Sequence, residues 1–273
     1  GMSSIAKYLV QKGHNVKGYD QRKSFLTNQL EQDGIKVEFE KDKLNYSEAT
    51  LYIYSSAINL EDKYLNIYKN KDNVISRPEF LTELSRESKI IGITGTHGKT
   101  STTALLAHIF HYNNIDVSYI FGGSTSYSGI GGHFGGPDQP LVLETDEAFN
   151  TFKNIEINDL LVTNIDEDHL DYFKSFENLK EAFIHVINKV KNNIVLNYDD
   201  EHLKKINPTS NCLTYSSKEE TTFKIIYPNK FVFDNIKYEI ITNLIGSHFI
   251  SNIVGAICLA NLNGISIENS LKA

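Results

Sequence analysis

The sequence predicts an α/β protein with a mostly parallel sheet, because short apolar strands alternate with helices along most of the chain. The alternation is interrupted by a helix with an apolar face over residues 77–89, which separates an earlier series of strands and helices from a later one. We therefore expect two domains of ordinary size, residues 1–86 and residues 87–273.

The first series is typical of a Rossmann-like domain, in which helices cover a parallel sheet. Glycines stand where its helices should end, and polar residues close its strands. The predicted elements are a helix with Ile5, Leu9 and Val10 on one face, strands over 15–19, 35–39 and 51–54, and a helix over 26–33.

The second series repeats this order and adds a hairpin. Residues 122–136 contain seven glycines, which is typical of a mobile loop. Residues 222–241 alternate between apolar and polar side chains and predict a β-hairpin that turns at Pro228-Asn229. The other predicted elements are strands over 89–94, 141–143, 160–163 and 194–196, and helices over 99–112 and 176–190.

The composition argues against several classes of protein. With 40% hydrophobic and 22% charged residues, the 273-residue chain should be globular rather than disordered. Its formal net charge of −7, without a basic segment, argues against broad binding to nucleic acid or to an anionic membrane. Cys212 and Cys258 are far apart, so neither a disulfide framework nor a zinc site is expected, and a reduced compartment such as the cytoplasm fits. No apolar stretch reaches the length of a membrane span.

The segment Gly95-Thr96-His97-Gly98-Lys99-Thr100 predicts a phosphate loop, because it joins an apolar strand to a helix that begins at about Lys99. Ser101, which follows, is a further candidate for nucleotide binding. Backbone N–H groups and the helix dipole attract phosphate there, the Lys99 ammonium reaches the β- and γ-phosphates, and the Thr100 hydroxyl is placed to bind Mg²⁺. The match to GxxxxGK is incomplete, because the first glycine of that pattern falls at Ile93. The alternative is a glycine-rich turn with a solvated lysine.

Acidic residues and a histidine follow two strands that should lie near this loop. Glu144 and Asp146 close the strand over 141–143, a position that commonly places a carboxylate near a nucleotide's metal ion. His169 follows the strand over 160–163, at the carboxyl edge where ligands bind in such sheets. A solvated loop carboxylate and a structural, hydrogen-bonding histidine are the alternatives.

Several motifs, taken in order, resemble the Mur ligase family, the amide-forming enzymes of peptidoglycan precursor synthesis. GITGTHGKTSTTALLAHIF is similar to the ATP loop of that family, and its histidine before Gly98 resembles members that join L-alanine to UDP-N-acetylmuramate. The other similar segments are GMSSIA at the start, SSAI (55–58), RPEFLTEL (77–84), LETDE (143–147), VTNIDEDHLDYF (162–173) and GSHFISN (246–252).

This resemblance implies roles for individual residues. Glu144 is the expected metal carboxylate, His169 the ligand of a second metal near the γ-phosphate, and Asn252 the contact to adenine. Because Mg²⁺ prefers oxygen ligands, Mn²⁺ is an alternative at His169. The chain departs from the family's E-A-D-E-S segment at Thr145 and Ala148, and Phe249 replaces an asparagine of the last motif.

The first domain is expected to hold the UDP-sugar. If Gly1 is the last glycine of a dinucleotide-type loop, Asp20 lies about where an acidic residue reaches a ribose hydroxyl. Ser55 and Ser56, at a strand end, are candidates for the diphosphate or the sugar. Ordinary turn formation is the alternative for all three residues.

The implied activity is an ATP-dependent ligation through an acyl phosphate, with Lys99, Glu144 and His169 as catalytic residues. Three alternatives remain: a ligase that adds a recycled muropeptide, a P-loop kinase, and a nucleotide-binding fragment without activity. The alternative of an inactive fragment comes from the two ends of the chain. Both Gly1-Met2 and Leu271-Lys272-Ala273 lie inside helical patterns, which suggests a piece of a longer protein without the family's third domain.

Overall fold

The computed structural model describes residues 1–40, 50–58 and 73–273. The helices of these residues are α1 (Met2–Gln11), α2 (Phe25–Gln32), α4 (Arg77–Glu87), α5 (Lys99–Tyr112), α6 (Leu170–Phe173), α7 (Phe176–Asn188), α8 (Ser247–Leu262) and α9 (Ile267–Lys272), with 3-10 helices η2 (Ala148–Asn154) and η3 (Leu203–Lys205). The strands are β1 (Lys17–Tyr19), β2 (Lys36–Glu38), β3 (Tyr52–Tyr54), β4 (Val74–Ser76), β5 (Ile90–Thr94), β6 (Ser118–Thr125), β7 (Gly129–His133), β8 (Leu141–Glu144), β9 (Asp159–Val162), β10 (Asn193–Asn197), β11 (Asn211–Ser216), β12 (Phe223–Ile226), β13 (Lys230–Phe233) and β14 (Ile236–Glu239).

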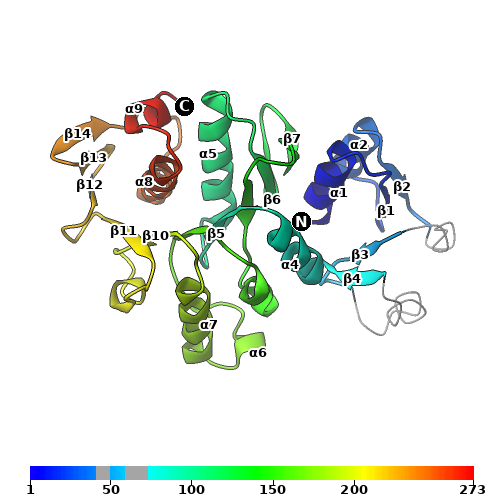
Figure 1. Cartoon of the computed structure of the whole chain (residues 1–273), viewed down its shortest axis with the longest axis horizontal. Coiled ribbons are helices and arrows are strands. Elements are labelled where there is room, and N and C mark those ends of the chain that lie inside the picture. The colour runs from blue at the N-terminus through cyan, green and yellow to red at the C-terminus, as the bar shows by residue number, and fades with distance from the viewer. Residues whose placement is uncertain (41–49, 59–72) are drawn as a thin grey trace.

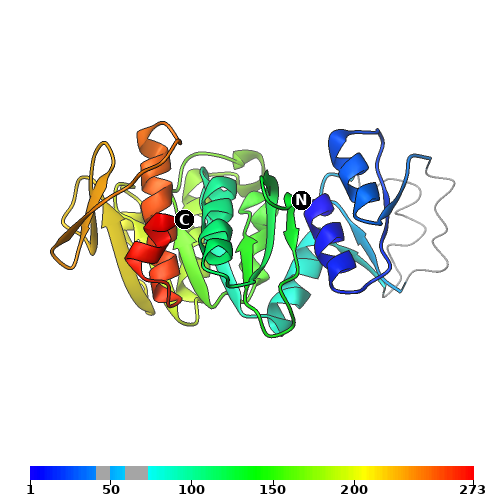
Figure 2. The same cartoon turned by 90° about the horizontal axis from the view of Figure 1, so that it is seen from above.

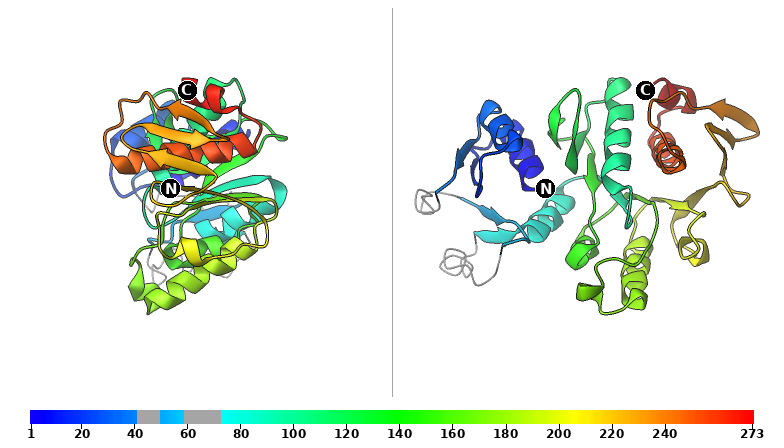
Figure 3. Two further views of the ribbon diagram at one scale, coloured as in Figure 1. Left: turned by 90° about the vertical axis from the view of Figure 1, so that its left-hand side faces the viewer. Right: turned by 180° about the vertical axis from the view of Figure 1, so that it is seen from behind.

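Helices cover both faces of one large sheet. Helices α5 and α8 lie above the sheet in Figure 1, and α4 and α7 lie below it. The N-terminal elements α1 to β4 lie beyond one end of the sheet, and β14 lies at the other end (Figure 2). The views from the side and from behind show the same layers (Figure 3). The predicted α/β fold class is confirmed.

The large sheet is mostly parallel. Within the described residues its ten strands follow the order β14-β13-β12-β11-β10-β9-β5-β8-β6-β7. The strands from β6 to β12 in this order all pair in parallel, whereas β7 at one edge and β13 and β14 at the other pair antiparallel. Parallel strands joined by crossover helices need cover on both faces, which the helix layers supply.

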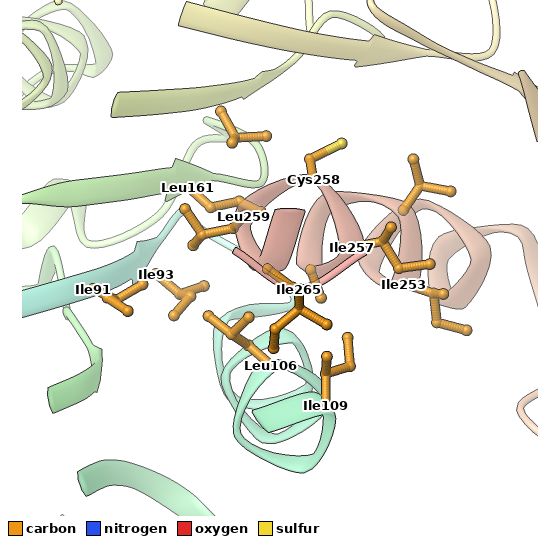
Figure 4. Packing of buried hydrophobic residues seen from close by; sticks show 14 of the residues in the cluster. Ile91, Ile93, Leu106, Ile109, Leu161, Ile253, Ile257, Cys258, Leu259 and Ile265 are labelled. Carbon is orange, nitrogen blue, oxygen red and sulfur yellow. The ribbon is translucent and has the colours of Figure 1, made fainter. Parts of the chain in front are cut away.

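Strand β5 lies in the middle of the sheet, and all five of its residues are buried. Successive side chains of a strand point to opposite faces. Ile91 and Ile93 accordingly pack with α5 and α8 in one core cluster, while Ile90 packs in the cluster that contains α4 and α7. Figure 4 shows Ile91, Ile93 and Leu161 facing Leu106 of α5 and Leu259 of α8. This double burial explains the continuous apolar run before the phosphate loop.

The N-terminal elements form two separate parallel pairs among the described residues, β1 with β2 and β3 with β4. The predicted parallel direction is confirmed for both pairs, but these described strands do not join in the one sheet that was predicted, and β4 was absent from the prediction. Helix α4 leads from β4 into β5. It begins with a capping box, in which Ser76 and Glu79 exchange hydrogen bonds with each other's main-chain N–H groups. The domain boundary at residue 86 stays a prediction.

The prediction of a mobile loop over residues 122–136 was wrong. The structure forms the antiparallel strands β6 and β7 there, and helix α1 packs on them. A Cβ atom on Gly131 would lie 2.7 Å from the Phe121 ring, and one on Gly132 would lie 2.0 Å from the main-chain oxygen of Ser4. These glycines therefore permit close packing. Ser4 adds a hydrogen bond of 2.6 Å from its hydroxyl to the Phe121 carbonyl.

The predicted hairpin over residues 222–241 is confirmed, and the same range holds one strand more than expected. Strands β12 and β13 pair antiparallel around the turn at residues 227–229, and β14 adds a third antiparallel strand. Strand β11, which the sequence did not predict, joins this unit to the parallel sheet. In the part of the chain that the structure describes, no helix has the length and apolar character needed to cross a membrane.

We predict that Gly132→Ala loosens the packing of α1 on strands β6 and β7. The added methyl group meets main-chain atoms of Ser4, which have little freedom to move. Overpacking of this kind costs about 1–3 kcal/mol in the free energy of unfolding, measurable by urea denaturation. Gly18→Ala is the matched control, because nothing lies within 4 Å of a Cβ atom at Gly18. Equal stability of the two variants would contradict the packing role of Gly132.

Candidate active site

The loop between β5 and α5 has a backbone that only glycine adopts easily at two positions. Gly95 has a φ of 134° and Gly98 a φ of 84°. A Cβ atom on Gly95 would lie 2.1 Å from the Thr163 hydroxyl oxygen, and one on Gly98 would lie 2.9 Å from the Asn252 amide oxygen. Gly98 is the N-cap of α5 and has no side chain that could cap the helix. As in any helix, the N–H groups of the first turn have no partner inside the helix.

The Lys99 ammonium group lies within this loop. It donates hydrogen bonds to the main-chain oxygens of Gly95 at 2.7 Å and Thr96 at 3.1 Å. It also forms an ion pair with Glu147, at 2.8 Å from Oε2. The Lys99 side chain is 13% exposed and that of Glu147 is fully buried. The cation is thus positioned by the loop itself and by one buried carboxylate.

Two opposing effects act on Glu147. Burial raises the pKa of its carboxyl group above the ordinary value, while the charge and hydrogen bond of Lys99 act to lower it. Removing one partner of a buried ion pair lowers the free energy of unfolding by about 3–5 kcal/mol, because the other charge stays buried without compensation. Glu147 was not among the residues predicted from the sequence, although it ends the LETDE segment, which begins within β8.

Thr100 and Glu144 meet next to Lys99. The Thr100 hydroxyl donates a hydrogen bond of 2.7 Å to Glu144 Oε1, and the Gly122 N–H donates one of 2.6 Å to Oε2. Strand β8 pairs directly with β5, which places the end of β8 beside the start of the loop, as the sequence predicted. A hydroxyl and a carboxylate are oxygen ligands of the kind that Mg²⁺ prefers.

His169 reaches the same region from the other side of β5. It follows β9, which also pairs with β5, and it is the N-cap of α6 with a φ of 53°. Its Nε2 atom lies 3.7 Å from Glu147 Oε1. Ligand atoms of Asp146, Glu147 and His169 all lie within 4.8 Å of one another. The two carboxylates suit Mg²⁺ or Mn²⁺, whereas the imidazole is not one of the oxygen ligands that Mg²⁺ prefers.

The remaining loop residues contact the segment after β9. The Thr96 hydroxyl accepts a hydrogen bond of 2.9 Å from the Asp166 N–H. His97 is exposed, with Nε2 3.6 Å from Asp166 Oδ2. Ser101 lies in the first turn of α5. Of the sequence-predicted loop residues, Thr96 and His97 therefore contact the segment after β9.

Asn252 lies beside the loop as well, in the second turn of α8. Its amide group is the closest neighbour of Gly98, and the residue is 8% exposed. Phe249 is half-buried one turn earlier, with its ring 4.4 Å from that of His248. The structure thus brings Asn252 to the phosphate loop. Whether it contacts adenine stays a prediction.

The candidates in the N-terminal domain make local contacts. Asp20 is exposed, and its carboxylate accepts a hydrogen bond of 3.1 Å from the Arg22 N–H. The Ser55 hydroxyl accepts one of 3.2 Å from the Ala57 N–H, and Ser56 is exposed. These contacts match the turn-forming alternative for Asp20 and Ser55. Substrate binding by Asp20, Ser55 and Ser56 stays a prediction.

Comparisons with known proteins agree with this architecture. A model described as "Mur ligase middle domain" matches residues 93–260, and one described as "Mur ligase family, catalytic domain" matches residues 1–89. The chain is 33% identical over 288 residues to the UDP-N-acetylmuramate–L-alanine ligase of Endomicrobium trichonymphae, covering 98% of this chain and 63% of that protein. Across three such curated relatives, the chain spans 61 to 63% of their length.

Two solved structures share the fold. The UDP-N-acetylmuramate-alanine ligase of Thermotoga maritima has a TM-score of 0.84 at 22% identity, covering 99% of this chain and 64% of that one. The UDP-N-acetylmuramate:L-alanyl-gamma-D-glutamyl-meso-diaminopimelate ligase of Neisseria meningitides has a TM-score of 0.84 at 20% identity, with coverages of 99% and 93%. From its matched domains and its relatives, this chain belongs to the Mur ligase family.

Proposed function

We propose that this chain provides the ATP site and the UDP-sugar domain of a cytoplasmic ligase that joins L-alanine to UDP-N-acetylmuramate in peptidoglycan precursor synthesis. One observation carries the proposal. Lys99, Thr100, Glu144 and His169 gather at the carboxyl ends of three adjacent parallel strands, where Lys99 and His169 both approach Glu147 and Thr100 contacts Glu144. Curated relatives at 33% identity bear the name of this ligase, which supports the choice of substrates.

In the proposed reaction, a carboxylate oxygen of the muramate attacks the γ-phosphorus of ATP, and the bond to the ADP oxygen breaks. The nitrogen of L-alanine then attacks the acyl carbon, loses a proton, and expels inorganic phosphate. The protein forms no covalent bond in either step. Its contribution is to align the reactants and to stabilise negative charge on the transferring phosphoryl group.

Different residues of the site bind the phosphates, the metal ions and the nucleoside. Lys99 and the N–H groups at the start of α5 hold the β- and γ-phosphates. Thr100 and Glu144 would hold one Mg²⁺, and His169, with Asp146 and Glu147 beside it, would hold a second Mg²⁺ or Mn²⁺. Such cations supply charge neutralisation between two anionic reactants. We assign the contact with the nucleoside to Asn252 of α8, which lies beside Gly98.

We predict that Lys99→Ala lowers the rate of ADP release at least about a hundredfold, because a preorganised cation at the transferring phosphate is lost. Affinity for Mg·ATP, measured by isothermal titration, should fall with it. Lys189→Ala is the control, since Lys189 is exposed near the end of α7. Near-normal ADP release by the Lys99 variant would contradict the assignment of the loop.

The choice between acceptors is tested by ADP release with UDP-N-acetylmuramate, in the presence of L-alanine or of the tripeptide L-alanyl-γ-D-glutamyl-meso-diaminopimelate. We predict that L-alanine raises the rate and that an amide product accumulates. A higher rate with the tripeptide would identify a ligase for recycled muropeptides. A stable phosphorylated product without amide would identify a kinase. Nucleotide binding without any turnover would leave the chain as a binding part only.

We predict that Glu147→Gln strengthens the binding of metal-free ADP about threefold or more, because it removes a negative charge that competes with phosphate for Lys99. Glutamine keeps the shape of the side chain, so a cavity is avoided. Titration of ADP in the presence of EDTA measures the effect, and Glu167→Gln, at an exposed position, controls for net charge. Unchanged or weaker ADP binding by the Glu147 variant would show that the ion pair does not oppose phosphate.

A further inference from the structure

The carbonyl oxygens of the phosphate loop are tied to partners within the protein. Those of Gly95 and Thr96 accept hydrogen bonds from the Lys99 ammonium. That of Gly98 accepts the Thr102 N–H at 2.9 Å, as part of α5. Carbonyl oxygens carry partial negative charge and repel phosphate oxygens, so their engagement elsewhere decides whether a loop attracts or repels an anion.

The remaining carbonyl group of the loop is that of His97, and its oxygen faces the end of β9. It accepts a hydrogen bond of 2.6 Å from the Thr163 hydroxyl and one of 3.0 Å from the Asn164 side-chain amide. The Thr163 hydroxyl oxygen also lies 3.2 Å from the Thr94 carbonyl oxygen. The peptide group that follows His97 is therefore held with its oxygen directed into the protein.

Asn164 contacts the loop through three polar groups. Its Nδ2 donates to the His97 oxygen, its Oδ1 accepts the His97 N–H at 2.8 Å, and its main-chain oxygen accepts the Thr96 N–H at 3.1 Å. The Asn164 side chain thus pairs with both the main-chain N–H and the main-chain oxygen of His97, as the main chain of a neighbouring strand would. A carboxamide suits this task, because it combines a donor and an acceptor in one plane.

We propose that Asn164 is a positioning residue that sets the polarity of the phosphate loop. By holding the His97 carbonyl away from the loop interior, it leaves the N–H groups of residues 98–101, which have no partner within the helix, as the groups that face a bound phosphate. The proposal rests on the nucleotide site proposed above. It also assigns the N–H groups of Thr96 and His97 to Asn164 rather than to phosphate.

The substitution Asn164→Asp tests this idea with almost no change in shape. The new carboxylate can still accept the His97 N–H, but an oxygen replaces the Nδ2 donor and faces the His97 oxygen, 3.0 Å away in the present structure. Two acceptors at that distance repel each other, so the loop peptide must turn or the carboxyl group must take a proton. A protonated carboxyl group has a donor again.

The experiment measures the affinity of the whole chain for Mg·ADP by isothermal titration at about pH 8 and about pH 5.5. Each variant is compared with the unsubstituted protein at the same pH. We expect Asn164→Asp to weaken binding at least about tenfold at the higher pH and to recover part of that loss at the lower pH, and Asn164→Ala to weaken binding about threefold or more at both. Asn192→Asp, at an exposed position before β10, should stay within about twofold.

Three results would overturn the proposal. Wild-type affinity of Asn164→Asp at the higher pH would show that the loop does not need the amide donor. A loss of the same size at both pH values would point to general distortion. A loss in Asn164→Asp with none in Asn164→Ala would reveal simple charge repulsion of the nucleotide. If the unsubstituted protein itself fails to bind Mg·ADP, the proposed function fails instead, which keeps the two ideas distinguishable.

Discussion

The site depends on one constraint, the position of β5 between the parallel neighbours β8 and β9. Parallel strands end at the same edge of a sheet, so the phosphate loop, the acidic segment after β8 and the histidine segment after β9 meet there. The burial of β5 on both faces holds it between the two helix layers, where Ile91 and Ile93 pack with α5 and α8 and Ile90 packs in the cluster of α4 and α7. The packing of α5 and α8 on the sheet then brings Gly98 and Asn252 together.

Within this frame, charge and hydrogen bonding prepare the loop for an anion. Lys99 is shared between loop carbonyls and Glu147, and Asn164 engages the His97 peptide groups from the neighbouring strand. Glu147 keeps a buried cation compensated, and the side chains after β9 keep carbonyl oxygens away from the loop interior. The same edge of the sheet therefore supplies the positive charge, the N–H groups and the oxygen ligands that a nucleotide triphosphate and its metal require.

Much of this arrangement could be predicted from local sequence. The strand, loop and helix over 89–112 were identified because an apolar run, two glycines and a lysine follow one another, and Glu144 was placed beside the loop because parallel neighbours end together. The glycines over 122–136 were misread, since glycine marks both loose turns and tight packing, and only the position of Ser4 distinguishes the two. Glu147 and Asn164 were missed because their partners, Lys99 and His97, are distant in sequence and meet only across strands.

The most direct test of the account is a crystal structure of the chain with Mg·ADP. The account predicts the β-phosphate at the N–H groups of residues 98–101, with the Lys99 ammonium moved from Glu147 to phosphate oxygen and the His97 carbonyl still held by Asn164. Nucleotide bound away from the loop, or a Lys99–Glu147 ion pair unchanged beside bound phosphate, would contradict it.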